Sequence, residues 1–398
     1  MAASKLQDGS IFSKRTDANA RMAMFDVAVI GSGPAGSCAA LALARSGANT
    51  VLLERERLPR YKTCGGGLTP RAIRALPPGI DSVIERRCDT VDVRLLDAGV
   101  LLRTRRAFPL IAMTMRDRLD FALASAAAAA GADLRAPCRV TGVRAEERAV
   151  HLETTGGVMT ARFVVAADGA LSETARLSGW PDGRNLVPAL EYELCDDAAL
   201  ERFAGAPRFD FGGVAHGYAW VFPKAARLSV GVLSVRRGAR DLRVALERYL
   251  RQLGIRAANA ARHGFVIPLR PRGAPYVRGR VMLVGDAAGF ADPVTAEGIS
   301  LAALSGRLAA DAIMASMLDP ARVANAYHAA LDHAILPGLG TGRWLARVLY
   351  DHARLRTLMV RAAGQRAADA ITDVACGARS YREAVRVALA GAITRAAR

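Results

Sequence analysis

The sequence has few cysteines, few aromatic residues, almost no lysine and no long apolar run, and each scarcity excludes something. Across the 398 residues, no apolar run approaches the roughly 20 residues that span a bilayer as a helix. The longest candidate, Phe121–Ala132, is short and mostly alanine. Residues 1–23 are polar and lack the apolar centre of a secretory signal. We therefore expect a cytoplasmic protein whose first 23 residues form a flexible tail.

The cysteines are too scattered to build a metal cluster. No two of them form a CxxC pair or another metal-binding spacing, and a chain without a secretory signal usually keeps its thiols reduced. The six positions are Cys38, Cys64, Cys88, Cys138, Cys195 and Cys376. Since an iron–sulfur cluster needs grouped ligands, we predict neither such a cluster nor any other metal site.

The net charge of +18 comes almost entirely from arginine. The lysines are Lys5, Lys14, Lys62 and Lys224 among 55 basic residues, and alanine is abundant. This skew indicates a bias across the whole chain rather than a selected basic face. A protein that tracks nucleic-acid phosphates would cluster its charge with aromatic residues, which make up only 6% here. We predict no nucleic-acid partner, and leave open either a solvated surface or peripheral contact with an anionic membrane.

What the sequence does contain begins with a nucleotide-binding pattern. Phe25–Ile30 is a continuous apolar run, typical of a strand buried on both faces of a parallel sheet. A helix is predicted over Pro34–Ser46 and a second strand over Asn49–Leu53. A GxGxxG segment, residues 31–36, lies between the first strand and the helix. Together these elements predict one βαβ unit that binds a dinucleotide.

Each part of this pattern has a physical purpose. Gly31 permits the tight turn, Gly33 lets the backbone approach a pyrophosphate, and Gly36 allows close packing of helix on strand. The helix start offers unpaired N–H groups to phosphate, and an acid at the end of the second strand can bind the adenosine ribose. The predicted residues are Gly31, Gly33, Pro34, Ala35, Gly36, Glu54 and Arg55.

Later segments complete the predicted organisation. A helix is expected over Asp117–Ala130, a buried strand over Arg280–Val284 and a helix over Glu297–Met314. Residues 181–270 carry short alternating segments, which indicate an antiparallel sheet covering a ligand cavity. The fold class is therefore α/β, with a Rossmann-like nucleotide-binding domain interleaved with a smaller α+β domain. The predicted ranges are 24–85, 110–180 and 271–335 for the first domain, 86–109 and 181–270 for the second, and 336–398 for an Arg-rich helical region.

Two strand ends identify the cofactor as FAD by resemblance. Asp168-Gly169 and Gly285-Asp286 each follow an apolar strand, and both segments resemble signatures of the flavoprotein family that includes p-hydroxybenzoate hydroxylase. The resemblance implies that Asp286 holds the ribitol chain and that Gly298 and Ile299 offer N–H groups to the flavin pyrimidine edge. It also implies that Arg116 leans on the cofactor, with a surface arginine at a helix start as the alternative. The arginine that usually follows the DG motif falls one residue late here, at Arg176.

Two further motifs point to the substrate. Residues 62–67, KTCGGG, resemble the KxCGG signature of the geranylgeranyl reductase family, and residues 217–224, GYAWVFPK, resemble its YxWxFP…GxG substrate motif. The resemblance covers most of residues 24–335. One departure is Leu233, which stands where the second glycine of GxG is expected. The residues implied are Gly66 and Gly67 for the cofactor, Cys64 for catalysis, and Tyr218, Trp220, Phe222 and Pro223 for the substrate.

The family resemblance implies an FAD-dependent reductase that saturates carbon–carbon double bonds of an isoprenoid chain. An isolated double bond is unpolarised, so hydride transfer needs an acid, and Cys64 or a nearby hydroxyl is the candidate. A thiol that only packs against the ring is the alternative for Cys64, as a core cluster is for Phe222. The electron donor is expected to be NADPH or ferredoxin. His216 receives no role.

Two other functions stay open at this point. The first is a flavin-dependent monooxygenase or halogenase of the same superfamily, although the halogenase motif WxWxIP would place Trp and Ile where Tyr218 and Phe222 stand. The second is a non-catalytic flavin-binding or membrane-associated electron carrier. That carrier would be expected to hold cluster-ligating cysteines, which the sequence lacks.

Overall fold

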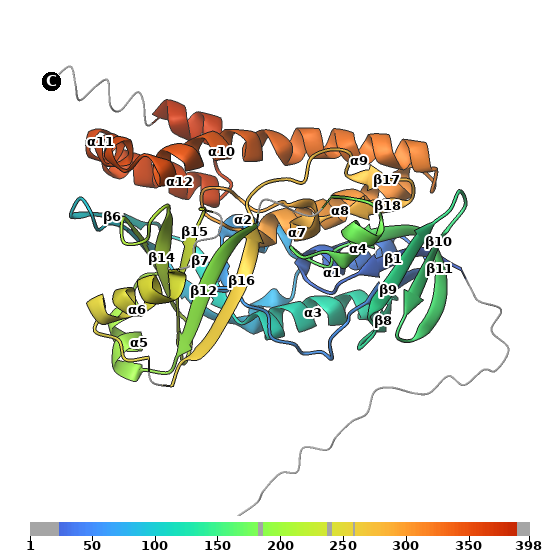
Figure 1. The fold of residues 1–398 in the computed structure, drawn as a ribbon, viewed down its shortest axis with the longest axis horizontal. Helices are drawn as coiled ribbons and strands as arrows, with labels where there is room; N and C mark the ends of the chain where they lie inside the picture. The colour runs from blue at the N-terminus through green and yellow to red at the C-terminus, as the bar shows by residue number, and fades with distance from the viewer. Residues whose placement is uncertain (1–23, 182–185, 237–240, 258, 388–398) are drawn as a thin grey trace, which may run out of the picture.

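The structure, a computed structural model, describes residues 24–181, 186–236, 241–257 and 259–387. The predicted tail at 1–23 and the last part of the predicted helical region, 388–398, lie outside the described residues. Figure 1 shows a sheet with helices at one end of the molecule, a second sheet at the other end, and a row of C-terminal helices along one side of both.

The first sheet is built around β1 (Phe25–Ile30), whose last four residues are buried. This strand pairs in parallel with β2 (Thr50–Leu53) on one side and with β11 (Gly157–Ala166) on the other, as expected for a strand that is apolar apart from Asp26. Along its main path the order is β17-β18-β11-β1-β2-β8, and the hairpin strands β9 and β10 continue from β11. The remaining bounds are β8 (Asp133–Arg135), β9 (Val140–Ala145), β10 (Val150–Thr154), β17 (Val277–Arg278) and β18 (Val281–Leu283).

Helices α1 (Pro34–Arg45) and α8 (Ile299–Ala315) pack closely because small residues line their contact. A Cβ atom added to Gly306 would lie 2.1 Å from the carbonyl oxygen of Ala35, so only glycine permits this approach. The helix α3 (Arg116–Ala129) also packs on α1. Short helices follow strands of the same sheet at α4 (Glu173–Leu177) and α7 (Gly285–Ala288).

The second sheet has seven strands among the described residues, in the order β16-β12-β15-β14-β13-β5-β6. Its outer face packs on α6 (Leu242–Gln252) through residues such as Val221 and Val230. Its other face carries the alternate residues, including Tyr218 and Trp220, because successive side chains of a strand point to opposite faces. The bounds are β5 (Thr90–Leu95), β6 (Val100–Arg105), β12 (Leu186–Leu194), β13 (Arg208–Phe211), β14 (Gly217–Pro223), β15 (Leu228–Ser234) and β16 (Ala261–Pro268), with α5 (Asp197–Phe203) near β14.

A small third sheet joins the two larger ones. It has the order β3-β7-β4, and its strand β3 is part of the glycine turn. The bounds are β3 (Gly67–Leu68), β4 (Ile84–Cys88) and β7 (Ile111–Thr114), and α2 (Pro70–Ala75) and a 3₁₀ turn at Ile80–Val83 lie between β3 and β4.

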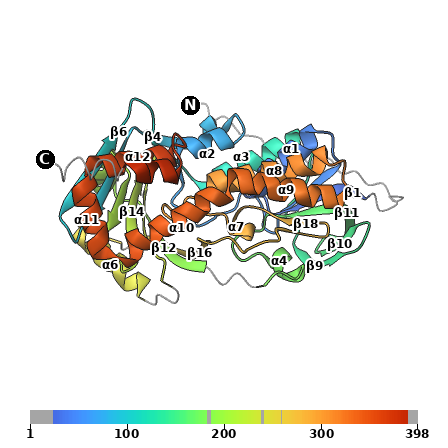
Figure 2. The same cartoon turned by 90° about the horizontal axis from the view of Figure 1, so that it is seen from above.

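The C-terminal helices cover both large sheets. Figures 1 and 2 show α9 and α10 running end to end along the molecule, with α11 and α12 folding back beside the second sheet. Their bounds are α9 (Pro320–Ala334), α10 (Leu336–Asp351), α11 (Ala353–Ala363) and α12 (Gln365–Ala375). No helix among the described residues is long and apolar enough to cross a membrane.

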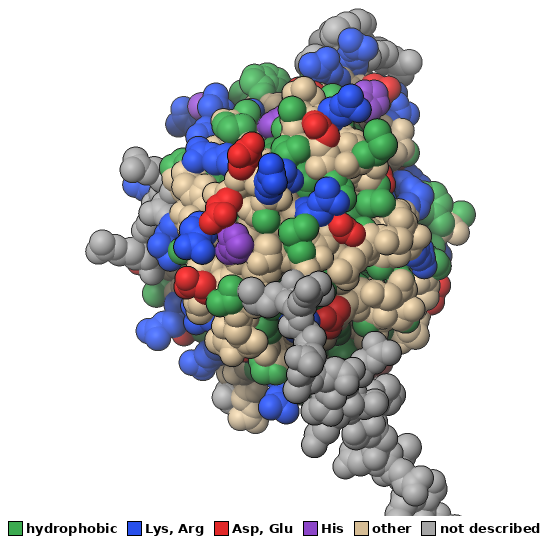
Figure 3. Space-filling view, turned by 90° about the vertical axis from the view of Figure 1, so that its right-hand side faces the viewer, with side chains coloured by type: hydrophobic (Ala, Val, Ile, Leu, Met, Phe, Trp, Pro, Cys, Tyr) green, Lys and Arg blue, Asp and Glu red, His purple; other side chains and the backbone are tan. Residues whose placement is uncertain are grey.

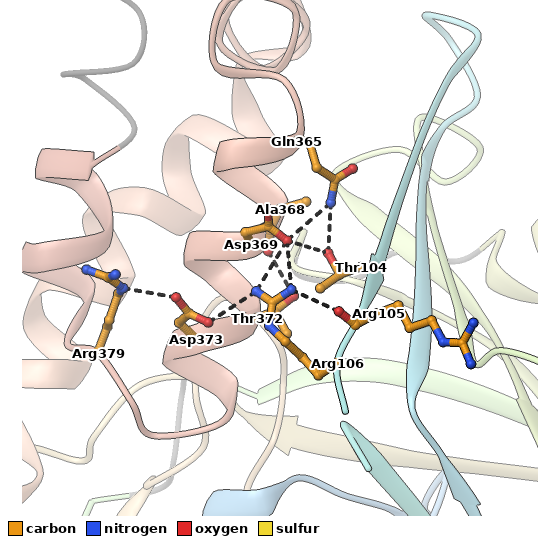
Figure 4. A network of polar contacts seen from close by, with 9 residues as sticks. All are labelled: Thr104, Arg105, Arg106, Gln365, Ala368, Asp369, Thr372, Asp373 and Arg379. Atoms are coloured by element: carbon orange, nitrogen blue, oxygen red, sulfur yellow. Dashed lines mark hydrogen bonds and ion pairs between the residues drawn. The ribbon is translucent and has the colours of Figure 1, made fainter. Parts of the chain in front are cut away.

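A polar network fastens α12 to β6 (Figure 4). The Asp369 carboxylate accepts hydrogen bonds from Thr104 at 3.2 Å and from both terminal nitrogens of Arg106 at 3.3 Å. Arg106 also contacts Asp373, and Gln365 donates to Thr104 at 3.0 Å. The helices therefore close over the sheet through side-chain contacts as well as apolar packing.

The predicted fold class is confirmed, with differences at the ends of elements. Helix α8 begins at Ile299 rather than at Glu297, because Asp292 holds residues 292–297 in a turn through its own side chain. Helix α1 ends at Arg45, one residue early. The domain boundaries stay a prediction. Figure 3 shows Lys and Arg side chains interspersed with Asp and Glu on the face at the first sheet's end.

Candidate active site

One cavity of about 660 Å³ runs from the carboxyl end of β1 to the inner face of the second sheet and on beneath the C-terminal helices. All the predicted site residues line it except Gly36, Gly285 and Pro223. Successive side chains of β14 point to opposite faces of the sheet, and Pro223 lies on the face opposite to that of Tyr218. It therefore points away from the cavity. The sequence motifs therefore converge on a single space, although they lie far apart along the chain.

The nucleotide end of the cavity is shaped by backbone rather than by side chains. Gly31 has φ of +100°, and a Cβ atom there would lie 2.5 Å from the carbonyl oxygen of Ala167. At Gly36 a Cβ atom would lie 1.9 Å from the carbonyl oxygen of Gly31. Helix α1 begins at Gly33 without a side-chain cap, so its first N–H groups face the cavity unshielded by a side chain. Such a helix start suits a phosphate group.

Glu54 is oriented before any ligand arrives. One carboxylate oxygen accepts from the backbone N–H of Ser32 at 3.1 Å and from its hydroxyl at 2.7 Å. Arg60 approaches the same oxygen at 3.1 Å. Burial alone would raise the pKa of Glu54, but Arg60 and the Ser32 hydrogen bonds hold it below its usual value. The carboxylate is therefore ionised and fixed at the end of β2, where the sequence places a ribose contact.

Arg116 is a buried residue, which corrects the alternative of a surface arginine. Its side chain is 11% exposed and makes two hydrogen bonds to Asp120, at 2.8 and 2.9 Å. Asp120 is fully buried and also accepts from Arg60 at 3.0 Å. Burial acts to lower the pKa of Arg116, but Asp120 and the Cys64 thiol outweigh it and raise the pKa. The cation is thus held against the cavity wall by one buried acid.

The two predicted strand-end acids differ in what they do. Asp168 accepts from the N–H of Thr174 at 2.9 Å and from the Ser172 hydroxyl, so it organises the start of α4 as well as lining the cavity. Asp286 lines the cavity at the start of α7. Burial raises the pKa of Asp286, and the nearby cations Lys62 and Arg116 offset this only in part. A hydroxyl-rich ligand such as a ribitol chain would supply the hydrogen bonds that this carboxyl group lacks.

Lys62 faces the same region from the glycine turn. Its ammonium nitrogen lies 3.5 Å from the centroid of the Phe265 ring. Burial and the neighbouring Arg116 lower the pKa of Lys62 to about 8, against the opposing effect of Asp286. In the sequence, Lys62 stands out only weakly, as one of the two lysines outside the tail.

The three glycines of the turn are required by neighbouring protein groups. Gly66 has φ of +73°, and its Cβ atom would lie 2.0 Å from the carbonyl oxygen of Thr114. Gly65 and Gly67 lie against the Phe222 ring, at 2.8 and 3.4 Å from their would-be Cβ atoms. The structure shows that an aromatic ring and a carbonyl group make the close approach to this backbone.

The substrate motif forms an aromatic wall. A Cβ atom on Gly231 would lie 2.1 Å from the Trp220 ring, so that glycine lets the indole lie flat across β15. Phe209 packs on Phe222 with ring centroids 5.2 Å apart. The Tyr218 hydroxyl donates to the carbonyl oxygen of Thr295 at 2.8 Å, which ties this wall to the loop before α8.

The loop before α8 is organised by a buried acid that sequence reasoning missed. Asp292 accepts from the Tyr381 hydroxyl at 2.6 Å and lies 3.5 Å from Arg71, which also pairs with Glu297 at 3.0 Å. Tyr381 comes from the C-terminal region, so no local pattern could reveal it. This network sets the position of Gly298, which precedes α8, and the Glu297 carboxylate accepts a hydrogen bond from the N–H of Ser300 in the first turn of that helix at 2.7 Å.

Other residues that the sequence did not single out also line the site or stand near it. Glu191 and Tyr61 line the cavity. His216, which received no role, contacts Asp351 of α10 at 3.0 Å. The sequence could not reveal this contact, because Asp351 lies 135 residues from His216 along the chain.

These features fit FAD. The glycine cradle and the start of α1 suit a pyrophosphate, Glu54 and Asp286 suit hydroxyl groups, and Gly298 and Ile299 line the cavity at the start of α8. The cavity extends beyond these residues into an apolar region, so it has room for a second ligand.

Comparisons with known proteins agree. A family model described as FAD binding domain matches residues 24–198. The chloroplastic geranylgeranyl diphosphate reductase of Oryza sativa is 30% identical over 75% of this chain and 68% of that protein. Digeranylgeranylglycerophospholipid reductase 2 of Methanothermobacter thermautotrophicus is 32% identical, over 74% of this chain and 80% of that protein.

The fold is shared with a solved structure. A geranylgeranyl bacteriochlorophyll reductase-like protein from Thermoplasma acidophilum superposes with a TM-score of 0.74 at 22% identity, over 91% of this chain and 98% of that chain. The structural match supports the fold, and the sequence matches support the family and its cofactor. The chain belongs to the geranylgeranyl reductase family of FAD-dependent oxidoreductases.

Proposed function

We propose that the protein saturates carbon–carbon double bonds in an isoprenoid chain. The main support for this proposal is the shape of the cavity. It joins a dinucleotide cradle to an apolar arm that is enclosed by the second sheet and the C-terminal helices. The named relatives act on geranylgeranyl compounds by their names, and the family membership makes the same substrate class the natural expectation.

The apolar arm is suited to a long hydrocarbon. It passes the aromatic wall and continues between β5 and α12, where its lining is aliphatic. The lining residues at that end are Val91, Val93, Leu95, Leu102, Val360 and Ala368. Each methylene buried there would contribute about 0.8 kcal/mol, so a polyprenyl chain would bind mainly by leaving water.

The reaction needs a hydride and a proton. Reduced FAD, when bound, supplies the hydride. The protein supplies the proton and excludes water, since an isolated double bond accepts a hydride only as positive charge develops on the neighbouring carbon. We propose that Cys64, which is half-buried at the cavity wall beside Arg116, contacts the reacting region and relays the proton.

The electron donor and the membrane contact are further proposals. NADPH or ferredoxin would reduce the flavin. Trp344 and Leu358, on α10 and α11, are 54% and 65% exposed and lie among arginines, which would suit docking on anionic lipid. A solvated surface is the alternative.

The direct test is anaerobic turnover of the chemically reduced, FAD-loaded protein with a geranylgeranyl lipid. Mass spectrometry is expected to show a gain of two hydrogens for each double bond reduced. A long-lived oxygen adduct of the reduced protein would instead favour the monooxygenase or halogenase alternative. Rapid reduction of dyes or quinones without any change in lipid mass would favour the electron carrier.

A further inference from the structure

A row of residues crosses the inner face of the second sheet and changes from apolar to polar along the way. Phe209, Trp220, Gly231, Glu191 and His263 stand opposite one another on β13, β14, β15, β12 and β16. Directly opposed residues share a face of a sheet, so the whole row faces the cavity side. The apolar part ends where the indole lies across Gly231, and the next residue is a carboxylic acid.

Glu191 is buried and connected to the aromatic wall. It is 1% exposed and lines the cavity. One carboxyl oxygen accepts from the Ser229 hydroxyl at 2.7 Å, and that hydroxyl oxygen accepts from the Trp220 indole N–H at 3.4 Å. The other carboxyl oxygen accepts from the Tyr61 hydroxyl at 3.3 Å. A short hydrogen-bonded chain thus joins the carboxyl group to the substrate wall.

Glu193, which lies on the same face of β12 as Glu191, has its pKa shifted in the opposite direction. Glu193 is paired with Lys224 at 3.1 Å and with Arg227 at 3.0 Å. Burial would raise the pKa of Glu193, but Lys224 and Arg227 hold it low. Burial raises the pKa of Glu191, and Lys224 opposes this only in part. Enzymes that use acid catalysis often hold two carboxyl groups in surroundings that raise the pKa of one and lower the pKa of the other.

Lys224 is the neighbouring cation that favours the ionisation of Glu191. Tyr61 faces it from the loop after β2, Ser229 from β15 and His263 from β16, while Glu193 adds negative charge on β12. Lys224 donates to Glu193 rather than to Glu191. The surroundings of Glu191 therefore favour its neutral form more than the surroundings of Glu193 favour that of Glu193.

Tyr61 is partly exposed and contacts the carboxyl group of Glu191. Its side chain is 41% exposed, and its ring stacks on His263 with centroids 4.1 Å apart. The hydroxyl group that contacts Glu191 belongs to this partly exposed residue. The Tyr61 hydroxyl is thus the group from which a proton can pass to Glu191 in the proposal made here.

We propose that Glu191 is the acid whose proton reaches the double bond, with Cys64 as the relay at the cavity wall, and that Tyr61 reprotonates Glu191 from water. This inference rests on the proposed function. In the balanced reaction, one alkene carbon accepts the hydride from reduced FAD and the other accepts the Glu191 proton. The alkene π bond, the Glu191 O–H bond and the N–H bond of reduced FAD that carries the hydride would break, two C–H bonds would form, FAD would be left oxidised and Glu191 would be left as a carboxylate. Water then returns the proton.

The first test needs no turnover. Infrared spectra of the FAD-loaded protein at neutral pH are expected to contain the carbonyl stretch of a protonated carboxyl group that disappears in Glu191→Gln. The same band should vanish from the wild type as pH rises, while a Glu201→Gln variant on the exposed surface of α5 keeps it. Identical spectra of the wild type and Glu191→Gln would overturn the proposal.

The second test follows lipid reduction by the reduced protein. Acid catalysis contributes roughly 10²- to 10⁴-fold, so Glu191→Gln should lose about that much in turnover with unchanged FAD content. Wild-type turnover should fall as pH rises through the pKa of Glu191, and Glu191→Asp should retain a titrating step at a shifted pH. Tyr61→Phe keeps the ring stack and should slow only repeated turnovers.

The outcomes separate the two proposals. If the wild type reduces no lipid double bond, the proposed function fails whatever the variants do. If the wild type reduces the lipid and Glu191→Gln does so at the same rate with the same pH profile, the proposed function stands and the role of Glu191 fails. Should Glu191→Gln not fold, Glu191→Asp and the wild-type infrared titration still decide the question.

Discussion

The nucleotide end and the substrate end of the cavity are specified in different ways. The nucleotide end is set by backbone within a short stretch, where Gly31 and Gly36 leave no space for a side chain. The substrate end is assembled from β5, the strands β12 to β16 and the C-terminal helices, and its shape depends on which side chains face inward. A phosphate cradle can therefore be read from local sequence, whereas an apolar tunnel depends on contacts between distant segments.

Among the variants considered, Gly36→Ala at the nucleotide end is expected to change stability and FAD binding most. The added methyl group would lie 1.9 Å from the carbonyl oxygen of Gly31, and backbone cannot yield as a flexible side chain can. We expect a loss of about 3 kcal/mol or more in the free energy of unfolding, together with loss of FAD. Flavin absorbance of the purified protein and thermal unfolding measure both.

The matched control for that change is Gly338→Ala in α10. Nothing lies within 4 Å of a Cβ atom at this position, and alanine favours a helix. FAD content and stability should both stay at or slightly above the wild-type level. Equal FAD binding by the two variants would contradict the importance of the backbone cradle.

The next effect is expected from Gly231→Ala, which alters only the substrate end. A Cβ atom there would lie 2.1 Å from the Trp220 ring, so the indole must rotate away from β15. Overpacking of this kind typically costs about 1–3 kcal/mol. Lipid turnover should fall while FAD content stays unchanged, and a variant that loses flavin instead would show that the two ends are not separable.

A smaller effect is expected from Asp369→Asn, which weakens the attachment of α12 to β6. The side chain is 36% exposed and contacts a partly exposed Arg106, so we expect a loss of about 1 kcal/mol in stability. The Michaelis constant for lipid should rise, because α12 covers the apolar arm. Asp89→Asn is the control: its partner Arg105 is 77% exposed, and neither stability nor turnover should change measurably.

The smallest effect is expected from Cys64→Ser, since a hydroxyl group can still relay a proton. Turnover should fall by less than the roughly 100-fold lower limit typical of losing an acid, with FAD content unchanged. Stopped-flow rates for one turnover would measure this. Turnover equal to that of the wild type would remove Cys64 from the mechanism.

The sequence placed the glycine turn and the end of β2 together because the determinants of this unit are local, and these residues line one end of the cavity, while their contacts with FAD stay a prediction. It also placed Tyr218, Trp220 and Phe222 on the cavity wall through their alternation, although Pro223 falls in the opposite set. It could not predict the role of Glu191, since an acid at alternate positions of a strand usually indicates a solvated face. Only the contacts of Glu191 with Tyr61 and Ser229 reveal that this position is buried.

Two features of the cavity rim escaped prediction for the same reason. The turn held by Asp292 depends on Tyr381, which is 89 residues away. The start of α8 was therefore predicted two residues early. Contacts of this range leave no periodic pattern in the sequence, so they become visible only in the fold.

The central claim is that a single cavity brings the flavin and an apolar, unsaturated chain together. The most direct measurement is the absorbance of the reduced, FAD-loaded protein after anaerobic mixing with a geranylgeranyl lipid or with the same lipid fully saturated. We predict rapid return of oxidised flavin absorbance with the unsaturated lipid and none with the saturated one. An identical absorbance change with both lipids would show that the reduced flavin is not oxidised by the double bonds of the lipid.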